Sequence, residues 1–288
     1  MDLLSNHASI DQLPKLGSID VNRLWESIPM LPINCNSPML DRYMERHDAW
    51  TEKIRLMGLD GGLLVDFRVL PALDKLVQYL YSQSGWTRPE IYVVSDMGRK
   101  GIDSWSAVSV VSDKRPVILL GTQLVELLNE SELAFIIGHE TAHLIGYNND
   151  WRKDMSLSFL IRELVETNRH TELHHIVPGI QWQTAYLQIM ANCRAMEMRC
   201  DRLGLLLCGD FNAASRSLLA VTLKSEKLAR SVDLHSYLAV QEPLLATSPV
   251  AGPISVNAGH PFLPFRIKSL LEFVQSGSFN QFSRMYMR

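Results

Sequence analysis

The chain has 288 residues, of which 47% are hydrophobic and 20% are charged, so it can bury the core of a globular protein. Its net charge of −3 argues against a nucleic-acid partner, because nucleic-acid binding usually needs a basic face. No apolar run approaches the roughly 20 residues that span a bilayer, and the N-terminus lacks the pattern of a signal peptide. We therefore expect a cytoplasmic protein with no integral membrane segment.

The first 84 residues are expected to form an irregular arm and a helical region. Scattered Pro, Asn and Ser residues make residues 1–38 irregular, and apolar periodicity predicts helices at residues 38–57 and 71–81. We expect residues 1–84 to pack on a catalytic domain formed by residues 85–288.

The next part of the chain alternates β-branched, apolar segments with turn residues, which is typical of strands. The predicted strands are residues 91–94, 107–111 and 116–120. From Gly121 onward the pattern is mostly helical. A sheet this small does not fold alone, so we expect it to share one domain with the helices that follow.

A predicted helix that opens at Asn129 carries the pattern His-Glu-x-x-His. His139 and His143 lie one turn apart and differ by about 40° around the axis, so both imidazoles reach one point. The pattern supplies two neutral nitrogens for zinc and, in Glu140, a carboxylate beside them. It predicts a zinc-bound water with a pKa near ~7, whose proton Glu140 accepts as the water attacks a carbonyl.

Catalytic zinc needs a third protein ligand and an open position for water. The predicted helix 183–208 offers Glu197 as that ligand. Asp201 lies one turn further on the same face and can accept the spare N–H of a ligand histidine. The alternative is an exposed acidic pair on a solvated, arginine-rich helix face. The zinc interpretation predicts one Zn²⁺ per chain, bound by His139, His143 and Glu197.

Three of the four cysteines, Cys193, Cys200 and Cys208, fall in this same predicted helix. Cys193 and Cys200 are about 10 Å apart along the axis, too far for a disulfide, and free thiols fit a reducing compartment. Both lie one turn from Glu197. They are either small buried side chains, the commoner role, or thiols that approach the zinc and make the site sensitive to oxidation.

The His-Glu-x-x-His motif followed by Glu197-x-x-x-Asp201 resembles the gluzincin metallopeptidases, and within them the HtpX and CAAX prenyl protease group. Residues 121–134 are similar to that group's lead-in to the zinc helix, and residues 260–267 to its late His-Pro element. The resemblance covers about residues 85–275. It implies an α+β, mostly helical zincin-type fold with a small sheet whose edge strand borders the active-site cleft.

The resemblance also implies catalytic roles. A peptide would lie antiparallel beside residues 107–111, and His260 or Arg266 would support the oxyanion beside zinc. Two simpler roles stay open. His260 can belong to the turn before a helix that starts near Pro261, and Arg266 can pin that helix to the core.

The chain departs from the group in two ways. The group commonly carries Asn-Ala-Phe before the second strand, where this chain has a different sequence at residues 101–107. These residues should line the cleft, so subsite preference does not transfer. The membrane-spanning helices of better-known members are absent, so the resemblance implies a soluble catalytic domain.

These observations predict a zinc-dependent endopeptidase with a peptide or protein substrate. Two alternatives stay open. One is a dedicated processing peptidase for one peptide partner. The other is a non-catalytic zinc-binding regulatory module, or an enzyme kept latent by the N-terminal arm lying in the cleft.

Overall fold

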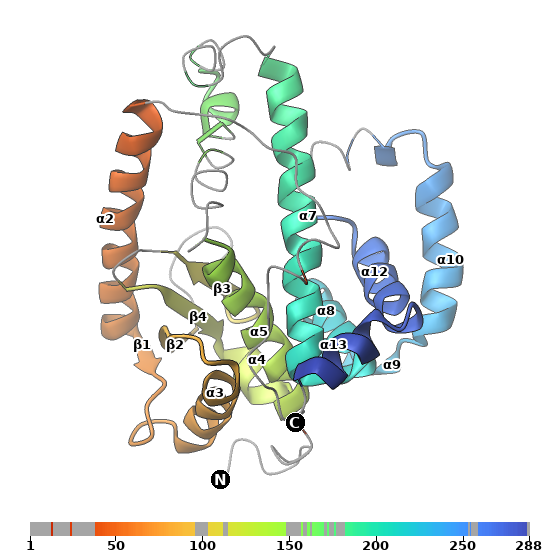
Figure 1. The fold of residues 1–288 in the computed structure, drawn as a ribbon, viewed down its shortest axis with the longest axis horizontal. Helices are drawn as coiled ribbons and strands as arrows, with labels where there is room; N and C mark the ends of the chain where they lie inside the picture. Colours follow the sequence, from red (N-terminus) through yellow and green to blue (C-terminus); the bar gives the residue numbers. More distant parts are fainter. Residues whose placement is uncertain are drawn as a thin grey trace.

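Two long helices and a small sheet organise the molecule (Figure 1). In this computed structural model the described residues are 38–95, 103–111, 115–147, 163–169, 182–252 and 259–286, with Leu13, Leu24, Leu157, Leu160, Ile161, Glu172, Ile176 and Ile254. The long helices are α2 (Pro38–Gly61) and α7 (Trp182–Cys208). Both extend from the level of the sheet toward the top of Figure 1, and shorter helices surround the base.

The sheet has four strands in the order β1-β2-β4-β3, with β2 and β4 parallel and the two outer pairs antiparallel. The bounds are β1 (Gly62–Leu64), β2 (Glu90–Val94), β3 (Ala107–Val110) and β4 (Val117–Gly121). The three predicted strands are therefore confirmed to within one residue. The sequence did not predict β1, because three residues are too few to show an alternating pattern. β3 is an edge strand of the sheet.

The predicted helices are also confirmed, and the first two are longer than expected. α2 continues to Gly61, and α3 continues to Ser84 and ends at Gly85, which adopts the left-handed conformation (φ 72°) that terminates a helix. The other helices are α3 (Pro71–Ser84), α4 (Thr122–Leu127), α5 (Glu130–Tyr147), α8 (Phe211–Leu223), α9 (Glu226–Ser231), α10 (Leu234–Thr247), α12 (Leu263–Gln275) and α13 (Ser278–Tyr286).

Helices cover both faces of the sheet. Ile91 and Val93 of β2 belong to the main core with α3, α5 and α7, whereas Tyr92 and Val94 belong to a second cluster with Ile54 of α2. Alternate residues of β2 thus point into two different cores. This explains why the strand is a continuous apolar run rather than an alternating one.

The helix α5 begins with a reciprocal cap. The Glu132 amide donates to Oδ1 of Asn129, and the Asn129 amide donates to Oε2 of Glu132, both over 2.9 Å. This arrangement satisfies two of the amides that the first helical turn leaves without a partner. The predicted opening of this helix at Asn129 is therefore confirmed.

α5 and α7 pack closely because both carry glycine at the contact. A Cβ on Gly204 would lie 2.7 Å from the carbonyl oxygen of Phe135, and a Cβ on Gly138 would lie 3.0 Å from Cα of Gly204. Real Cβ atoms essentially never come as close as the first of these distances. Glycine at these positions therefore lets the two backbones approach each other.

A third apolar cluster joins the upper parts of α2 and α7. Leu40 of α2 and Ile189 and Met190 of α7 pack with residues of the intervening segment, including Leu160 and Leu164. The two long helices are thus connected through this cluster.

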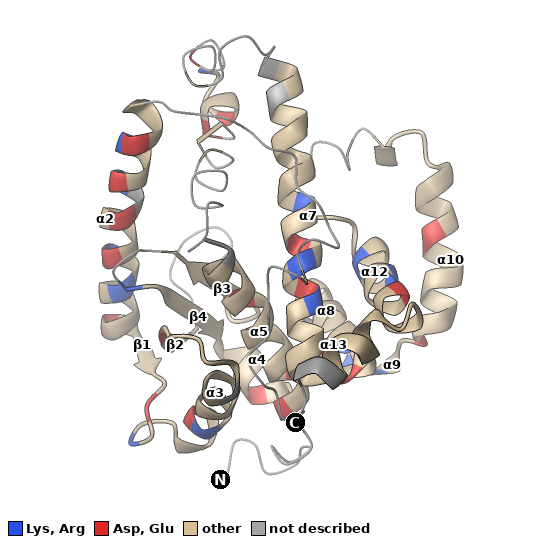
Figure 2. Cartoon of the chain, in the orientation of Figure 1, with Lys and Arg blue, Asp and Glu red and all other residues tan. Residues whose placement is uncertain are grey.

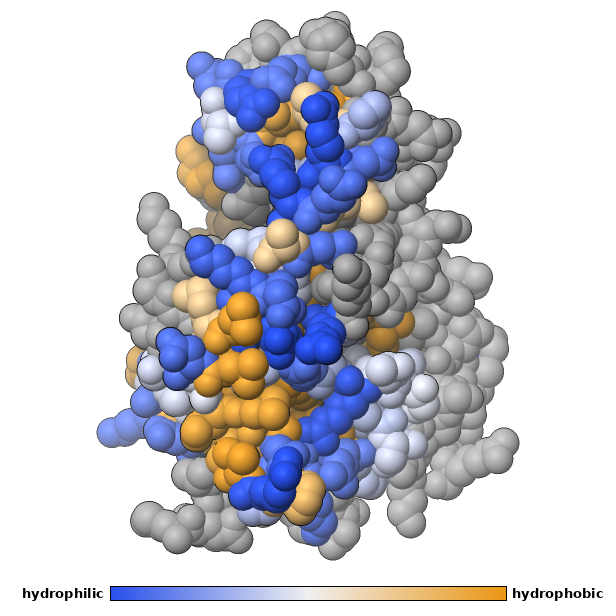
Figure 3. Space-filling model, turned by 90° about the vertical axis from the view of Figure 1, so that its left-hand side faces the viewer, coloured by the Kyte–Doolittle hydropathy of each residue, from blue (hydrophilic) through white to orange (hydrophobic). Residues whose placement is uncertain are grey.

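Charged and apolar residues are distributed unevenly over the surface. Acidic and basic residues are interspersed along α2 (Figure 2). The face on the α2 side carries an apolar area in its lower half (Figure 3). Exposed large apolar residues of α2, β1 and the following turn are Leu56, Leu59, Leu63, Phe67 and Val69. No described helix is long and apolar enough to cross a membrane.

Candidate metal centre and cleft

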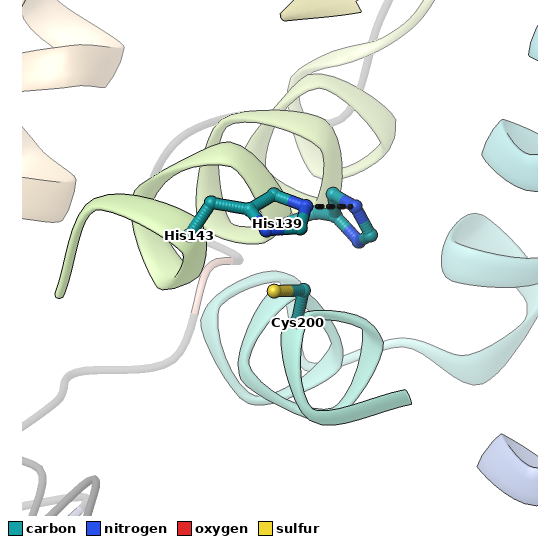
Figure 4. A group of neighbouring side chains, drawn as sticks. All are labelled: His139, His143 and Cys200. Carbon is teal, nitrogen blue, oxygen red and sulfur yellow. Dashed lines mark hydrogen bonds between the residues drawn. The ribbon is translucent and has the colours of Figure 1, made fainter. Parts of the chain in front are cut away.

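The helix α5 positions both histidines and Glu140. The Nε2 atoms of His139 and His143 are 3.2 Å apart, and the two rings are inclined at 76° (Figure 4). His139 and Glu140 are 8% and 7% exposed. The helical spacing therefore brings two nitrogens to one buried point, as the sequence predicts, and a bound cation would relieve the repulsion between their lone pairs.

The same helix is anchored from α3. The hydroxyl groups of Tyr81 and Thr141 are 2.5 Å apart, and Thr141 donates to the carbonyl oxygen of Ile137 over 2.6 Å. Thr141 lies between Glu140 and His143, so this contact fixes the part of α5 that carries the motif.

The helix α7 brings Glu197 to the histidine pair. Its carboxylate oxygens lie 3.5 Å from Nε2 of His139 and 3.5 Å from Nε2 of His143. Glu197 is 7% exposed, and Asp201, one turn later, is 1% exposed. The alternative of a solvated acidic pair is therefore wrong: α5 covers this face of α7, and Arg199, one of the arginines expected to be solvated, is itself 2% exposed.

Asp201 connects His139 to Arg266. Oδ1 of Asp201 lies 2.9 Å from Nδ1 of His139, and Arg266 donates to Oδ1 and Oδ2 over 2.6 and 2.8 Å. An ionised carboxylate accepts the proton of Nδ1, which leaves the Nε2 lone pair directed at the centre. Arg266 also lies 3.5 Å from Oε2 of Glu197. The structure thus brings Arg266 against the two carboxylates of α7.

The pKa values of these groups follow from burial and mutual charge. Burial raises the pKa of Asp201, but the charge and hydrogen bonds of Arg266 outweigh burial and hold it well below its usual range. Burial lowers the pKa of His139, but the hydrogen bond to Asp201 together with the negative charges of Asp201 and Glu197 outweighs burial and raises this pKa overall. Burial lowers the pKa of His143. For Glu197 burial is outweighed by nearby cationic groups, led by His143, so its pKa is lowered.

His260 lies at the edge of the same group. Its Nε2 is 3.3 Å from Oε1 of Glu197, and its side chain is 69% exposed. It precedes α12, the helix that carries Arg266. His260 therefore faces both solvent and the centre, and its side chain is much more exposed than those of His139 and His143.

Cys200 is a further donor next to the histidines. Its sulfur and one nitrogen of each of His139 and His143 all lie within 4.8 Å of one another (Figure 4). Cys200 is fully buried, and burial, followed by the charges of Glu197 and Asp201, raises the pKa of its thiol. Glu197 lies 3.5 Å from Nε2 of each imidazole and has a lowered pKa that favours its ionised form, so it is the better candidate for the third ligand.

A cavity of about 760 Å³ opens over the centre and includes His139, Glu140, His143 and Glu197 in its lining. One wall consists of the four residues of β3 and the residue that follows them, Val111. The edge strand thus borders the cleft, as the resemblance implies. Of residues 101–106, those described do not line the cavity. The carbonyl oxygen of Ser104 accepts one hydrogen bond from the Gln123 amide, and the Ser104 backbone lies close to Gly121 instead. Gly101 and Ile102 lie outside the described residues.

The lining of the cavity also includes residues that sequence reasoning missed. Tyr43, Arg46 and Trp50 of α2 line the cavity. Their spacing of three and four residues places them on one helix face. That spacing is visible in the sequence, but it does not reveal which surface the face approaches.

Comparisons with known proteins agree with this geometry. A family model described as Peptidase family M48 matches residues 109–274, more than half of the chain. The chain is also similar to the plastoglobule-localized metallopeptidase 48 of Arabidopsis thaliana chloroplasts, with 25% identity over 194 residues. This alignment covers 66% of the chain and 52% of that relative, so the chain spans about half the relative's length. No solved structure matches. The chain belongs to peptidase family M48, a family of metal-dependent peptidases.

Proposed function

We propose that the chain is a zinc-dependent endopeptidase in which Glu140 is the general base. The observation that carries this proposal is the meeting of three donors from two helices at a buried point of the cleft. These donors are Nε2 of His139, Nε2 of His143 and the carboxylate of Glu197, separated by 3.2 to 3.5 Å.

The donor separations fit a zinc ion. Zinc binds nitrogen and carboxylate oxygen at about 2.0–2.2 Å in tetrahedral sites, which places ligand atoms about 3.3–3.5 Å apart. Zinc in such a site lowers the pKa of a water ligand toward ~7 and polarises the carbonyl under attack. Glu140 follows His139 directly and lines the cavity, so its carboxylate can take the proton of the attacking water and pass it to the leaving amine.

The surrounding residues have separate proposed roles. Asp201 orients His139, and Arg266 holds Asp201 and Glu197 in place, which makes Arg266 a positioning residue rather than the oxyanion donor that the resemblance allows. His260 has the exposure that contact with substrate requires. We propose His260 as the group that supports the negative charge developing on the carbonyl oxygen.

The substrate is proposed to be an extended polypeptide. β3 is an edge strand that borders the cavity, and an edge strand can form main-chain hydrogen bonds with a peptide of any sequence. Residues of α2 and α8 also line the cavity, and we propose that they contact the side chains of the substrate. We propose residues 85–288 as the catalytic unit, on which residues 1–84 pack.

The described part of the N-terminal arm bears on the latency alternative. Leu13 and Leu24 are buried in the main core, and Tyr79 of α3 donates to the carbonyl oxygen of Leu13 over 3.2 Å. Neither leucine lines the cavity. These contacts favour a stabilising role for the arm over occupation of the cleft. Cys200 and Cys208 form no disulfide within the described part of the chain, and we propose a reducing, cytoplasmic compartment on that ground.

The variant Glu140→Gln tests the mechanism. We expect unchanged zinc content, because Glu140 is not a ligand, and a 10²- to 10⁴-fold slower cleavage of a peptide library. Glu126→Gln on α4, which changes an exposed carboxylate, is the matched control and should leave both quantities unchanged. Cleavage by Glu140→Gln at the wild-type rate would refute the assignment of the base.

A further inference from the structure

The free edge of β3 determines how an extended peptide would lie in the cleft. The Gly121 amide donates to the carbonyl oxygen of Ser106 over 2.7 Å, at the start of the ladder that joins β3 to β4. Hydrogen-bonded and non-hydrogen-bonded pairs alternate along an antiparallel ladder. The main-chain groups of Ala107 and Ser109 therefore face away from β4, toward the free edge, where a peptide can bind them.

The two faces of β3 lead to different parts of the molecule. The side chains of Val108 and Val110 pack in the cluster that contains Ile54 and Trp50 of α2, whereas Ala107 packs against the main core, to which α5 contributes. The side chains of an extended peptide alternate between the two faces of the sheet that it joins, and each lies beside its cross-strand neighbour. Every second side chain of a peptide on β3 therefore points toward α2.

This alternation includes the cleavage site. The two residues that flank the scissile bond are consecutive, so in an extended peptide their side chains point to opposite faces of the sheet. One of them faces α2 whichever register the peptide adopts. The surface that α2 presents to the cleft therefore contributes to the choice of cleavage site.

The surface of α2 in the cavity is mainly aromatic. Tyr43 and Trp50 are half-buried and line the cavity together with Val108 of β3. Among the described residues that α2 and β3 contribute to the lining, Arg46 alone is charged, and it pairs with Glu163 over 3.9 Å. The Arg46 side chain is 65% exposed, so this pair is largely solvated and selects only weakly for charge.

A hydrogen bond holds this part of α2 against the strand. The hydroxyl group of Thr51, which is 1% exposed, donates to the carbonyl oxygen of Val111 over 3.1 Å. Thr51 adjoins Trp50, and Val111 directly follows β3. The backbone that carries the indole is therefore held in a defined position relative to the edge strand.

We propose that Tyr43 and Trp50 form a specificity subsite for a large apolar side chain at one of the two positions that flank the scissile bond. The inference rests on the proposed function, because it assigns a substrate preference to the same cleft. α2 lies outside residues 109–274, which the family model matches. The subsite thus belongs to the N-terminal helical region of this chain and gives that region a role in substrate selection.

Cleavage of a peptide library by the full-length wild type tests the subsite without any variant. The cleavage sites should be enriched in large apolar residues on one side of the scissile bond. For peptides that differ only at this position, kcat/KM with Leu or Phe should exceed kcat/KM with Ala by about 10- to 100-fold. Equal values for Ala and for large apolar residues on both sides of the bond overturn the proposal.

Variants of α2 then assign the preference to its residues. Trp50→Ala should lower the ratio of the two kcat/KM values about 10-fold, and Trp50→Phe should keep most of it. The ratio compares two substrates of one sample, so a partly unfolded sample does not change it. Leu56→Ala is the matched control, because Leu56 is on α2, is 53% exposed and does not line the cavity. It should keep the wild-type ratio, and an unchanged ratio in Trp50→Ala overturns the proposal.

Peptide binding by the Glu140→Gln protein separates this inference from the proposed function. In fluorescence anisotropy, a labelled peptide with Leu or Phe at the selected position should bind about 10-fold more tightly than its Ala counterpart. Adding Trp50→Ala should remove the difference. A binding difference without cleavage by the wild type supports the subsite and refutes the peptidase. Cleavage without a preference refutes the subsite and supports the peptidase, and a wild type that neither cleaves nor binds peptides refutes both.

Discussion

The close contact between α5 and α7 offers a direct test of how the centre is assembled. A methyl group at Gly204 would lie 2.7 Å from the carbonyl oxygen of Phe135, whereas ordinary contacts begin at 3.4 Å. The obstacle is backbone, which cannot rotate away. In Gly204→Ala the two helices must therefore separate by about 0.7 Å at this point.

That separation acts on the ligands, because the histidines are on α5 and Glu197 is on α7. The gaps between the Glu197 carboxylate and the imidazoles, now 3.5 Å, would widen toward about 4.2 Å, while metal sites tolerate only about ±0.2 Å in bond length. We expect zinc affinity to fall on the order of 10–100-fold, as when residues that orient ligands are changed. The overpacking should also lower the free energy of unfolding by about 1–3 kcal/mol. The higher helix propensity of alanine offsets about 1 kcal/mol of this loss.

The assay is zinc affinity by competition with a chromophoric chelator, together with thermal unfolding of the metal-free protein. Gly61→Ala is the control, because a Cβ at Gly61 meets nothing within 4 Å. It should keep wild-type affinity. Wild-type zinc affinity in Gly204→Ala would refute the argument that the separation of α5 and α7 determines the ligand geometry.

Three further changes probe other parts of the molecule. Asp201→Asn replaces the carboxylate that faces Nδ1 of His139, so zinc affinity measured by the same competition should fall about 10–100-fold; an unchanged affinity would show that Asp201 does not orient the ligand. Leu24→Ala removes a fully buried side chain and should lower the free energy of unfolding by about 2–5 kcal/mol in urea titrations, without raising activity, whereas a gain in activity would favour the latency alternative. Burial and the hydrogen bond to Glu90 raise the pKa of Tyr92 to about 12, so the folded state keeps this proton longer than the unfolded state does, and stability should fall as the pH rises from about 10 to about 12. Tyr92→Phe should show a smaller loss over that range, and an equal loss would assign the alkaline instability to other groups.

Much of the local structure could be predicted from the sequence, because local patterns report local geometry. The spacing of His139 and His143 determines that both imidazoles lie on one side of α5, since a helix has 3.6 residues per turn. The pair Asn129 and Glu132 marks the start of that helix for the same kind of reason. The three longer strands were visible as apolar, β-branched runs, but β1, with three residues, was too short to be recognised.

The contacts between segments that are distant in the sequence were determined by the tertiary structure alone. Periodicity shows that a helix face is apolar, but not which surface it packs against. The sequence therefore allowed Glu197 and Asp201 to be either solvated or buried, and the packing of α7 on α5 through two glycines buries them beside the histidines. In the same way, only the packing of α12 directs Arg266 to Asp201. The lining of the cleft by α2, far earlier in the chain, likewise depends on contacts that no local pattern encodes.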